Sequence, residues 1–481
     1  MKLFKYLVLL ITVALPLACT DDLLEEVSRG NITDDSFWQS ESDFLVALRG
    51  SIYDISEPFG GYSLWQYIVE DLGTDYTTGG YFATTLYTDY SDWNSTTPDF
   101  TGWGIWPQLW GSINKANTVI SRLEESDLEA SVRTRIKGEA LAQRALAYFT
   151  LLKWFGPVPE LTDPNDTRLS IPRGTIESNY DLIESDLITA ADALPLKSEL
   201  MSSGEAEYAR LTKGSAQGLL AKAYLEQGNY AECVTVTGEI INSGEYSLSP
   251  QYMDIFSLEN EGFSNMEAVW TIAFRAETNT ELQTQVLHPY LYKASERTEF
   301  SAIQNWGNIA MTQSFYQSFD EADQRRNGLY LSPTDNQVMI TKFPPDLSDG
   351  TGIHSGNDYY FIRYADVLLM RAEAFNELDD IGSSITELNK VRSRAGLSPL
   401  SVADFNKESL KQQIFDERRW ELYLEGHIKQ DTKRMFEERL LDHIRSVSSD
   451  WENVGAERYL LLPFPEQALS SNPGLEQNEG F

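Results

Sequence analysis

The sequence has few cysteines and few basic residues. Its 481 residues include only two cysteines, Cys19 and Cys233, so at most one intramolecular disulfide could form. Lysine and arginine together number 38 against 73 aspartates and glutamates, which gives a net charge of −35 at pH 7. Nucleic acids and anionic lipid surfaces both attract proteins through basic residues. The charge balance therefore argues against nucleic acid as a partner and favours a soluble, self-repelling protein.

Recognisable catalytic motifs are also missing. The chain has no HExxH zinc motif, no GxSxG nucleophile elbow, no P-loop and no GxGxxG dinucleotide fingerprint. The four histidines, His288, His354, His427 and His443, lie apart without metal-ligand spacing. Two acids for glycoside hydrolysis need to meet only in space, so a pairing among 73 acids is uninformative. We predict no enzyme activity, no metal and no cofactor.

The apolar run from Leu7 to Leu15 is too short to cross a bilayer as a helix, which takes about 20 residues. It follows two lysines and leads through Pro16-Leu17-Ala18 to Cys19. A charged start, an apolar centre and a small residue at the cleavage point are typical of a secretory signal. A signal that ends at cysteine resembles the lipobox of bacterial lipoproteins, in which the new N-terminal cysteine is acylated. Residues 1–18 are thus expected to be a lipoprotein signal peptide, with an ordinary secretory signal as the alternative.

Acidic residues follow Cys19 at once, at Asp21, Asp22, Glu25 and Glu26. An acidic stretch at this place resembles the surface-export signal of Bacteroidetes lipoproteins. Removal of the first 18 residues takes two lysines and no acid, which changes the net charge from −35 to −37. If Cys19 carries lipid, no intramolecular disulfide is possible, even in an oxidising compartment. The mature chain is expected to be lipid-anchored and to face outward.

Helical periodicity dominates the rest of the chain. The stretch from Glu129 to Phe155 has apolar residues at helical spacing and ends at a Gly-Pro pair. Two stretches, near 213–243 and 360–394, are predicted to form paired helices with a turn between them. The small residues and the glycine turn of the first resemble a tetratricopeptide unit. With a third pair expected near 408–441, the pattern predicts an all-α scaffold.

Two segments lack a long helical period, near 58–104 and near 244–358. Both are rich in aromatic and loop-forming residues. Loops on a rigid scaffold commonly provide binding groups, because the scaffold holds them in place. No Pro/Ser linker divides the chain. We therefore predict a single domain over 19–481 with two loop-rich inserts, here called the first and the second insert.

Several blocks of sequence follow one another in a recognisable order. They are Trp106-x3-Trp110 with Ala116-Asn117, Arg144 to Phe149, Phe155 to Pro159, Arg363 to Ala374, Leu388 to Gly396, Glu417 to Leu422 with Gly426-His427, and Pro463 to Phe481. In this order they resemble the SusD/RagB family of Bacteroidetes outer-membrane lipoproteins, over nearly the whole mature chain. That family usually continues Glu-Gly-His with Arg, an aromatic residue and Asp-Leu, whereas His427 is followed here by Ile428-Lys429-Gln430-Asp431. This departure concerns local helix packing or partner contact, and not the fold.

The resemblance implies a nutrient-binding protein of the outer membrane that most often takes oligosaccharides. It also implies a partner, a SusC-like TonB-dependent transporter, over which the protein acts as a hinged lid that captures ligand and delivers it. Three alternatives stay open at this point: peptide instead of sugar as cargo, a surface glycoside hydrolase, and a tetratricopeptide scaffold for other envelope proteins.

Aromatic residues with short polar neighbours are dense in the first insert, and no lysine or arginine occurs from Gly50 to Asn114. Sugars present an apolar C–H face and a hydroxyl rim, which flat aromatic rings and short polar side chains suit. The candidate glycan-binding residues are Tyr76, Tyr90, Trp93 and Asn94 in the first insert and Tyr290, Tyr292, Arg297 and Trp306 in the second. Packing of loops on helices is the alternative, and it is favoured for Trp106 and Trp110. The absence of basic residues favours neutral glycans.

Overall fold

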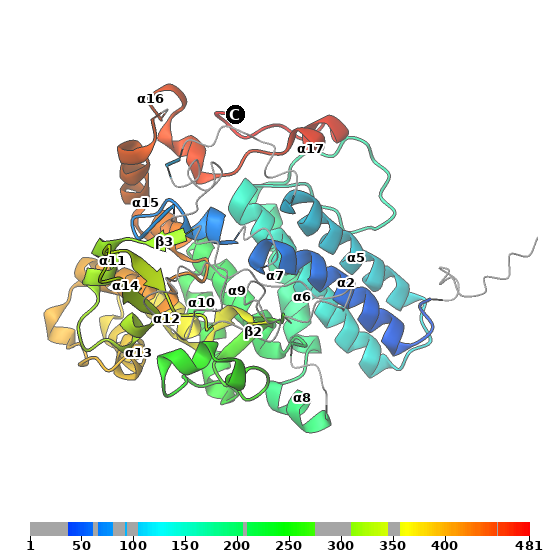
Figure 1. Ribbon diagram of the computed structural model, residues 1–481. Helices are drawn as coiled ribbons and strands as arrows, with labels where there is room; N and C mark the ends of the chain where they lie inside the picture. Colours follow the sequence, from blue (N-terminus) through cyan, green and yellow to red (C-terminus); the bar gives the residue numbers. More distant parts are fainter. Residues whose placement is uncertain are drawn as a thin grey trace, which may run out of the picture.

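The computed structural model describes residues 37–60, 66–79, 92–93, 104–204, 209–274, 309–344, 356–449 and 451–481. Helices dominate these ranges (Figure 1). The α-helices are α2 (Glu41–Gly60), α5 (Trp106–Glu124), α6 (Ala130–Phe155), α7 (Ile176–Ala193), α8 (Lys197–Ser203), α9 (Lys213–Gln227), α10 (Tyr230–Ser243), α11 (Gln313–Ser318), α12 (Tyr364–Glu377), α13 (Ile381–Arg394), α14 (Lys407–Leu422), α15 (Ile428–Val447), α16 (Trp451–Val454) and α17 (Glu466–Ser471). The prediction of a mainly helical fold is confirmed.

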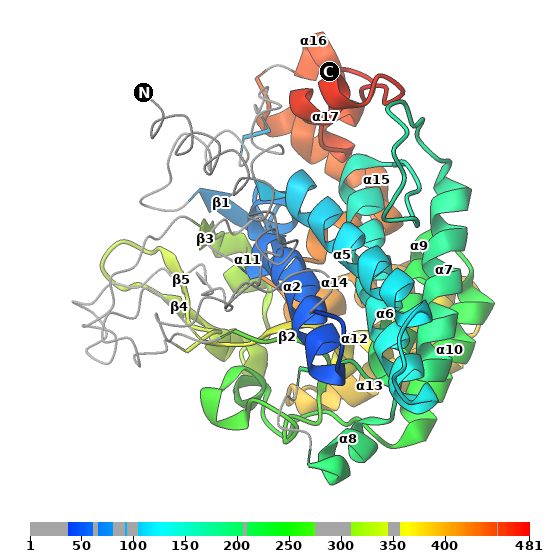
Figure 2. The same ribbon diagram turned by 90° about the vertical axis from the view of Figure 1, so that its right-hand side faces the viewer.

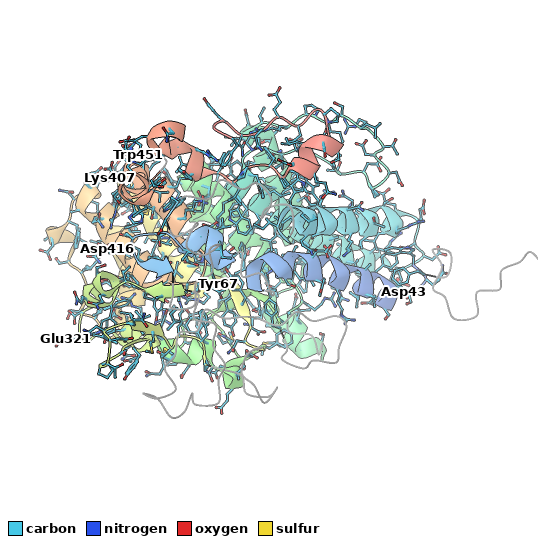
Figure 3. All side chains as sticks on the ribbon, turned by 45° about the horizontal axis from the view of Figure 1, so that its top comes forward. Asp43, Tyr67, Glu321, Lys407, Asp416 and Trp451 are labelled. Atoms are coloured by element: carbon cyan, nitrogen blue, oxygen red, sulfur yellow. The ribbon has the colours of Figure 1, made fainter. Side chains whose placement is uncertain are left out.

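The helices pack against one another in succession. Helices α2, α5, α6 and α7 lie side by side on the right of Figure 1, and each contacts the next. Helix α7 contacts α9, α9 contacts α10, and α10 contacts α12, which packs against both α13 and α14. In Figure 3, Tyr67 lies near the middle of the molecule, whereas Asp43 and Glu321 lie toward its two ends. The array is therefore a continuous scaffold from the N-terminal helices to α14.

Helix α6 lies at the centre of this scaffold, and from Gly138 to Leu152 each of its residues is buried. Such a helix must pair its polar side chains internally, because buried polar groups without partners are costly. The Arg144 guanidinium donates to both carboxylate oxygens of Asp186 on α7, at 2.8 and 2.7 Å, and to the Asn117 amide oxygen on α5, at 2.7 Å. The Arg144 block of the sequence thus holds three helices together.

The three expected helix pairs correspond to α9 with α10, α12 with α13, and α14 with α15. Gly228 makes the turn of the first pair with φ +77°, a conformation that favours glycine. The second pair starts later than predicted: the helix begins at Tyr364, because Tyr359–Arg363 forms a strand instead. All five residues of that strand are buried. A short, fully buried strand has no polar–apolar alternation, so periodicity does not distinguish it from the start of a helix.

Short strands make up two small sheets that the sequence did not predict. One sheet has the order β1-β3-β5-β4, from Thr77–Gly79, Ile309–Met311, Val338–Ile340 and Leu329–Leu331, with antiparallel neighbours. The other pairs β2 (Ala268–Ile272) with β6 (Tyr359–Arg363). Figure 2 shows β1, β3, β4 and β5 on one side of the helical array. Strands of three residues are too short to show alternation, so periodicity could not reveal them.

Aromatic packing follows one of the sequence expectations closely. Trp106 contacts Phe155 and Phe464 edge-on, with ring centroids 5.2 Å away in each case, and also contacts Trp110. These rings belong to or pack against the largest core cluster, so the packing role favoured for Trp106 and Trp110 is confirmed.

Cys233 is buried, and burial raises the pKa of its thiol to about 12. Within the described ranges, no helix combines the length and hydropathy that crossing a bilayer requires.

Candidate functional site

The described ends of the two inserts meet in one sheet. Gly79, the last described residue of β1, is the antiparallel partner of Ile309, the first residue of β3. The Thr312 amide extends this contact by donating to the Tyr76 carbonyl at 2.8 Å. The first insert therefore continues beyond Gly79 at the same edge of the sheet at which the description of the second insert resumes, at Ile309. We call this place the insert junction.

Most of the predicted site residues lie outside the described residues. They are Tyr90 and Asn94 of the first insert, Tyr290, Tyr292, Arg297 and Trp306 of the second, and Cys19, the predicted lipidation site. The structure therefore reports on two of the predicted glycan-binding residues, Tyr76 and Trp93.

Tyr76 lies directly before β1 and is 0% exposed. Its ring packs against Phe315 of α11, with centroids 4.9 Å apart, and its hydroxyl donates to the carboxylate of Asp71. A ring without exposed surface offers no face on which a sugar could stack. The expectation that Tyr76 is a binding platform is therefore corrected: the residue anchors the insert junction to the core.

Asp71 ends the π-helical turn η3 (Tyr67–Asp71), which is buried throughout. Burial raises the pKa of Asp71 to about 8, although the hydrogen bond from Tyr76 opposes the shift, and the charge of Glu70 adds to it. The carboxyl group is therefore mostly protonated at neutral pH. One of its oxygens, Oδ2, has no hydrogen-bond partner in the described part of the chain. A neutral acid of this kind fits a structural role in an apolar setting.

Trp93 is also buried, with 7% of its surface exposed. Its indole N–H donates to the Gly73 carbonyl at 2.6 Å, and its ring lies edge-on to Tyr459 at 6.1 Å between centroids. The Lys429 ammonium of α15 lies 5.1 Å from its ring centroid. The expectation of a freely exposed Trp93 platform is corrected as well, because these contacts fasten this part of the first insert to the C-terminal region.

Asp75 connects the insert junction to the scaffold by ion pairs. One carboxylate oxygen accepts from Arg419 of α14 at 3.0 Å, and the other accepts from Arg439 of α15 at 2.8 Å. The Asp75 side chain is about one-third exposed, so each pair contributes modestly, on the order of 1 kcal/mol or less. Both arginines are thus occupied by the same acid at the edge of the junction.

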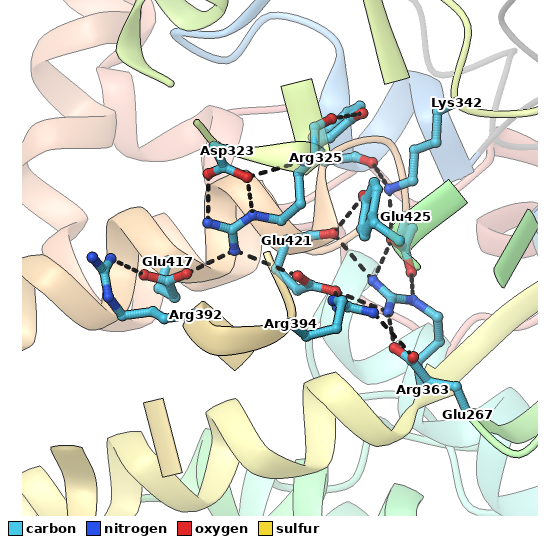
Figure 4. Close-up of polar contacts among 12 residues, drawn as sticks. Glu267, Asp323, Arg325, Lys342, Arg363, Arg392, Arg394, Glu417, Glu421 and Glu425 are labelled. Carbon is cyan, nitrogen blue, oxygen red and sulfur yellow. Dashed lines mark hydrogen bonds and ion pairs between the residues drawn. The ribbon is translucent and has the colours of Figure 1, made fainter. Parts of the chain in front are cut away.

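A buried ion network lies between the sheets and α13 and α14 (Figure 4). Arg363, the last residue of β6, donates to Glu425 at 2.6 and 2.8 Å and to Glu421 at 3.0 Å, and it also pairs with Glu267. Arg325 pairs with Asp323 and Glu417 as well as Glu421, and Lys342 donates to Glu425 at 2.6 Å. Elements from distant parts of the chain are held together here, which makes the network a structural support for the insert junction.

Glu421 is at the centre of this network and is fully buried. Burial by itself would raise the pKa of Glu421, but the charges of Arg394, Arg363 and Arg325 outweigh it and lower the pKa to about 2. Glu421 is therefore ionised at every pH at which the protein is expected to be folded. The Glu417-to-Leu422 block of the sequence thus has a structural explanation.

A second ion network explains the departure after His427. Asp431 accepts from Arg418 at 2.7 Å and from Arg434 at 2.8 Å, and Arg434 also pairs with Glu373 at 2.7 Å. Burial opposes ionisation of Asp431, but the Arg418 and Arg434 charges hold its pKa well below the usual range. The unusual segment therefore packs as an ordinary part of α15. Lys429, in the same segment, was not predicted to have a role.

A surface groove of about 480 Å³ lies among α7, α8, α9 and α10. Its lining includes Asp192, Lys213, Gln217, Glu239 and Glu245. The groove has charges of both signs, and rigid helices form its walls. Such a surface fits a protein partner better than a single small ion.

Metal binding has no support within the described ranges, where no group of three His, Cys, Asp or Glu side chains could hold an ion. Asp163 and Asp166, in the loop between α6 and α7, are engaged locally. Asp163 accepts from the Asn165 amide at 2.8 Å, and Asp166 is held by the Arg168 guanidinium.

Comparison with known proteins gives two family matches on separate parts of the chain. Residues 329–481 match the model described as the SusD family, and residues 61–225 match one described as starch-binding associating with outer membrane. SusD-like protein P2 of Formosa agariphila is 26% identical, and the alignment covers 99% of each chain.

Solved structures share the fold. A SusD superfamily protein from Bacteroides vulgatus superposes with a TM-score of 0.77 at 20% identity and covers 92% of this chain and 100% of its own. A structure described as a laminarin binding SusD-like protein also has a TM-score of 0.77, at 23% identity and with the same coverage. The two family matches, the full-length relative and the shared fold agree with the order of sequence blocks, and together they support a SusD-like family protein.

Proposed function

We propose that this protein binds an oligo- or polysaccharide at the insert junction and delivers it to a SusC-like TonB-dependent transporter. The pairing of Gly79 with Ile309 is the observation that supports this most directly, because it joins the two aromatic inserts at one place. The laminarin-binding relative of the same fold and the starch-binding family description point to the same ligand class.

The proposed site combines a rigid base with adaptable loops. The buried networks around Glu421 and Asp431 hold the strands and helices beneath the junction. Binding groups would come from the insert residues Tyr90, Asn94 and Trp306 and their neighbours. The protein would bind its ligand without altering it.

The proposed ligand is a neutral glycan. The first insert has no basic residue, and the two arginines that border the junction, Arg419 and Arg439, are paired with Asp75. Among the described residues, Arg419 and Arg439 could pair with an acidic glycan only if an ion pair with Asp75 opened first. Arg275, Lys293 and Arg297 of the second insert are the residues that would change this preference.

In the proposed arrangement, acylated Cys19 anchors the protein in the outer membrane, and the protein faces the cell exterior. The groove among α7, α8, α9 and α10 is the proposed docking surface for the transporter, since preformed helical surfaces change little on binding. Its mixed charges would set the orientation of the partner.

Calorimetry with neutral and acidic glycans tests the ligand. Each stacking aromatic should contribute roughly 1–3 kcal/mol, so Tyr90→Ala and Trp306→Ala should each weaken binding by about 5- to 150-fold without lowering the melting temperature. Tyr316→Ala is the matched control, because this part-exposed ring of α11 already stacks with Arg326 at 4.3 Å. Unchanged affinity in both insert variants, or binding of acidic glycans alone, would contradict the proposal.

A further inference from the structure

A small hollow lies beside Trp93, between η3 and the C-terminal segment. Its volume is about 40 Å³. Most of its walls are apolar side chains: Ile68, Val69 and Leu72 on one side and Leu461, Leu462 and Phe481 on the other. Leu461 and Phe481 are part-exposed and form its outer rim. A water-sized group needs about 10–15 Å³ of such volume, so the hollow has room for about three of them.

The one charged side chain that lines this hollow is Lys429. Only 4% of its surface is exposed. Throughout the described part of the chain, its ammonium makes no hydrogen bond or ion pair, and it lies 5.1 Å from the centroid of the Trp93 ring. Buried charges are normally paired, because desolvation of an isolated charge is costly. An unpaired ammonium at the wall of an apolar hollow therefore indicates a missing anion.

Neighbouring charged groups do not supply an anion that pairs with Lys429. Glu70 of η3 is the acid with the main influence on Lys429, but no ion pair joins the two: its Oε1 accepts from Lys153 at 2.9 Å and from the Trp154 indole, and its Oε2 has no hydrogen-bond partner in the described part of the chain. Lys153 and Lys433 add positive charge. Burial lowers the pKa of Lys429 to about 8, so it is still mainly protonated at neutral pH.

The remaining polar groups restrict the chemistry of the anion. The Trp93 N–H donates to the Gly73 carbonyl, and the Tyr459 hydroxyl oxygen accepts from Ser448 at 3.5 Å. A phosphate or sulfate would thus leave several oxygens without donors. A carboxylate group has three heavy atoms and a single charge, and the carbon attached to it is apolar on a fatty or aromatic acid.

We propose that this hollow binds an organic monocarboxylate, whose carboxylate pairs with the Lys429 ammonium while its carbon chain extends along the apolar rim. This site goes beyond the proposed function and does not depend on it. Its residues come from η3, Leu72 and Trp93 of the first insert, from α15 and from the C-terminal segment, whereas the glycan is assigned to the β1–β3 junction.

Thermal unfolding of the full chain with sodium propionate tests the site, with propionamide and sodium chloride at matched concentration for comparison. A ligand that binds only the folded state raises the melting temperature. We expect propionate alone to do so at about pH 6.5, and to lose most of this effect at about pH 9.5, where Lys429 is deprotonated.

Lys429→Met should abolish the increase, and Leu461→Trp should reduce it by filling the hollow. Lys433→Met is the matched control: it removes a nearby charge on the same helix that does not line the hollow, and it should keep the propionate effect. The proposal is overturned if propionate does no more than propionamide, if chloride is equally effective, or if the increase survives in Lys429→Met.

Discussion

The Arg363 guanidinium and the Glu421 carboxylate lie 3.0 Å apart, and neither side chain has any exposed surface. Arg363 ends β6, whereas Glu421 is near the end of α14. Glu421 also pairs with Arg394 of α13 and with Arg325 of the 3-10 helix η7 (Gln324–Gly328). A single carboxylate thus contacts three buried cations from three elements, and further acids complete their charge balance. Two blocks of the family pattern, at 363–374 and 417–422, meet at this contact.

Glu421→Gln should therefore strongly destabilise the protein. Removal of one partner from a buried ion network leaves uncompensated charge, which typically costs about 3–5 kcal/mol. Urea unfolding of the variant and the wild type measures this loss. Glu437→Gln is the control, because Glu437 is exposed on α15 and should change stability by less than about 0.5 kcal/mol. The same small effect for both variants would contradict the structural role of Glu421.

The Glu421 network also predicts acid sensitivity. Because the folded-state pKa of Glu421 is lowered from 4.5 to about 2, its contribution is fully present above about pH 4.5 and is lost as the pH falls toward 2. The wild type should thus lose stability over this window more steeply than Glu421→Gln. Circular dichroism at graded pH would reveal the difference, and parallel acid transitions would disprove it.

Asp71 should show the opposite pH dependence. Its folded-state pKa is raised from 3.8 to about 8, so the folded state keeps a proton that the unfolded state releases. Stability should therefore fall as the pH rises between these values, by at most about 1.4 kcal/mol for each pH unit. Asp71→Asn mimics the protonated form and should be more stable than the wild type at about pH 8. Asp404→Asn, at an exposed site, should leave the pH dependence unchanged.

Trp93→Ala is now expected to lower stability. The ring is buried, its N–H bonds to Gly73, and it contacts Tyr459 and Lys429. Truncation of a buried tryptophan typically costs about 3–5 kcal/mol. Trp93→Phe should recover part of this loss, since it keeps an aromatic ring in the site but lacks the indole N–H that bonds to Gly73. Differential scanning calorimetry gives the comparison, and an unchanged melting temperature for Trp93→Ala would mean that the ring is exposed in solution.

Cys19→Ala should prevent acylation and release the protein from the outer membrane or leave its precursor unprocessed. Metabolic labelling with a fatty acid measures the modification. Cys233→Ala is the matched control, because its thiol is buried in α10 and should not carry lipid. A labelled Cys19→Ala protein would exclude this residue as the anchor.

Association with a transporter should depend on the groove among α7, α8, α9 and α10. We expect a large TonB-dependent protein to copurify from native membranes in mild detergent. Lys213→Glu reverses a charge on the wall of the groove and should lower the recovery, whereas Lys137→Glu on the exposed side of α6 should not. Repeated recovery of the wild type as a monomer would argue against the lid arrangement.

The sequence by itself was sufficient for the family and for the helical scaffold. Helical periodicity is a local property, so helices such as α6 and α9 appear in the sequence close to their observed bounds. The aromatic packing of Trp106 was predictable for the same reason, because its spacing from Trp110 places both on one side of a helix start.

Only the tertiary structure decided which polar and aromatic residues are buried and what they contact. Tyr76 and Trp93 look like exposed platforms in a polar stretch of sequence, but the folded chain covers them with Phe315, Tyr459 and Lys429. The pairing of Gly79 with Ile309 joins residues far apart in the sequence through three-residue strands, which leave no periodic signal. Burial and long-range pairing depend on how separate elements pack, so these features appear only when the whole chain has folded.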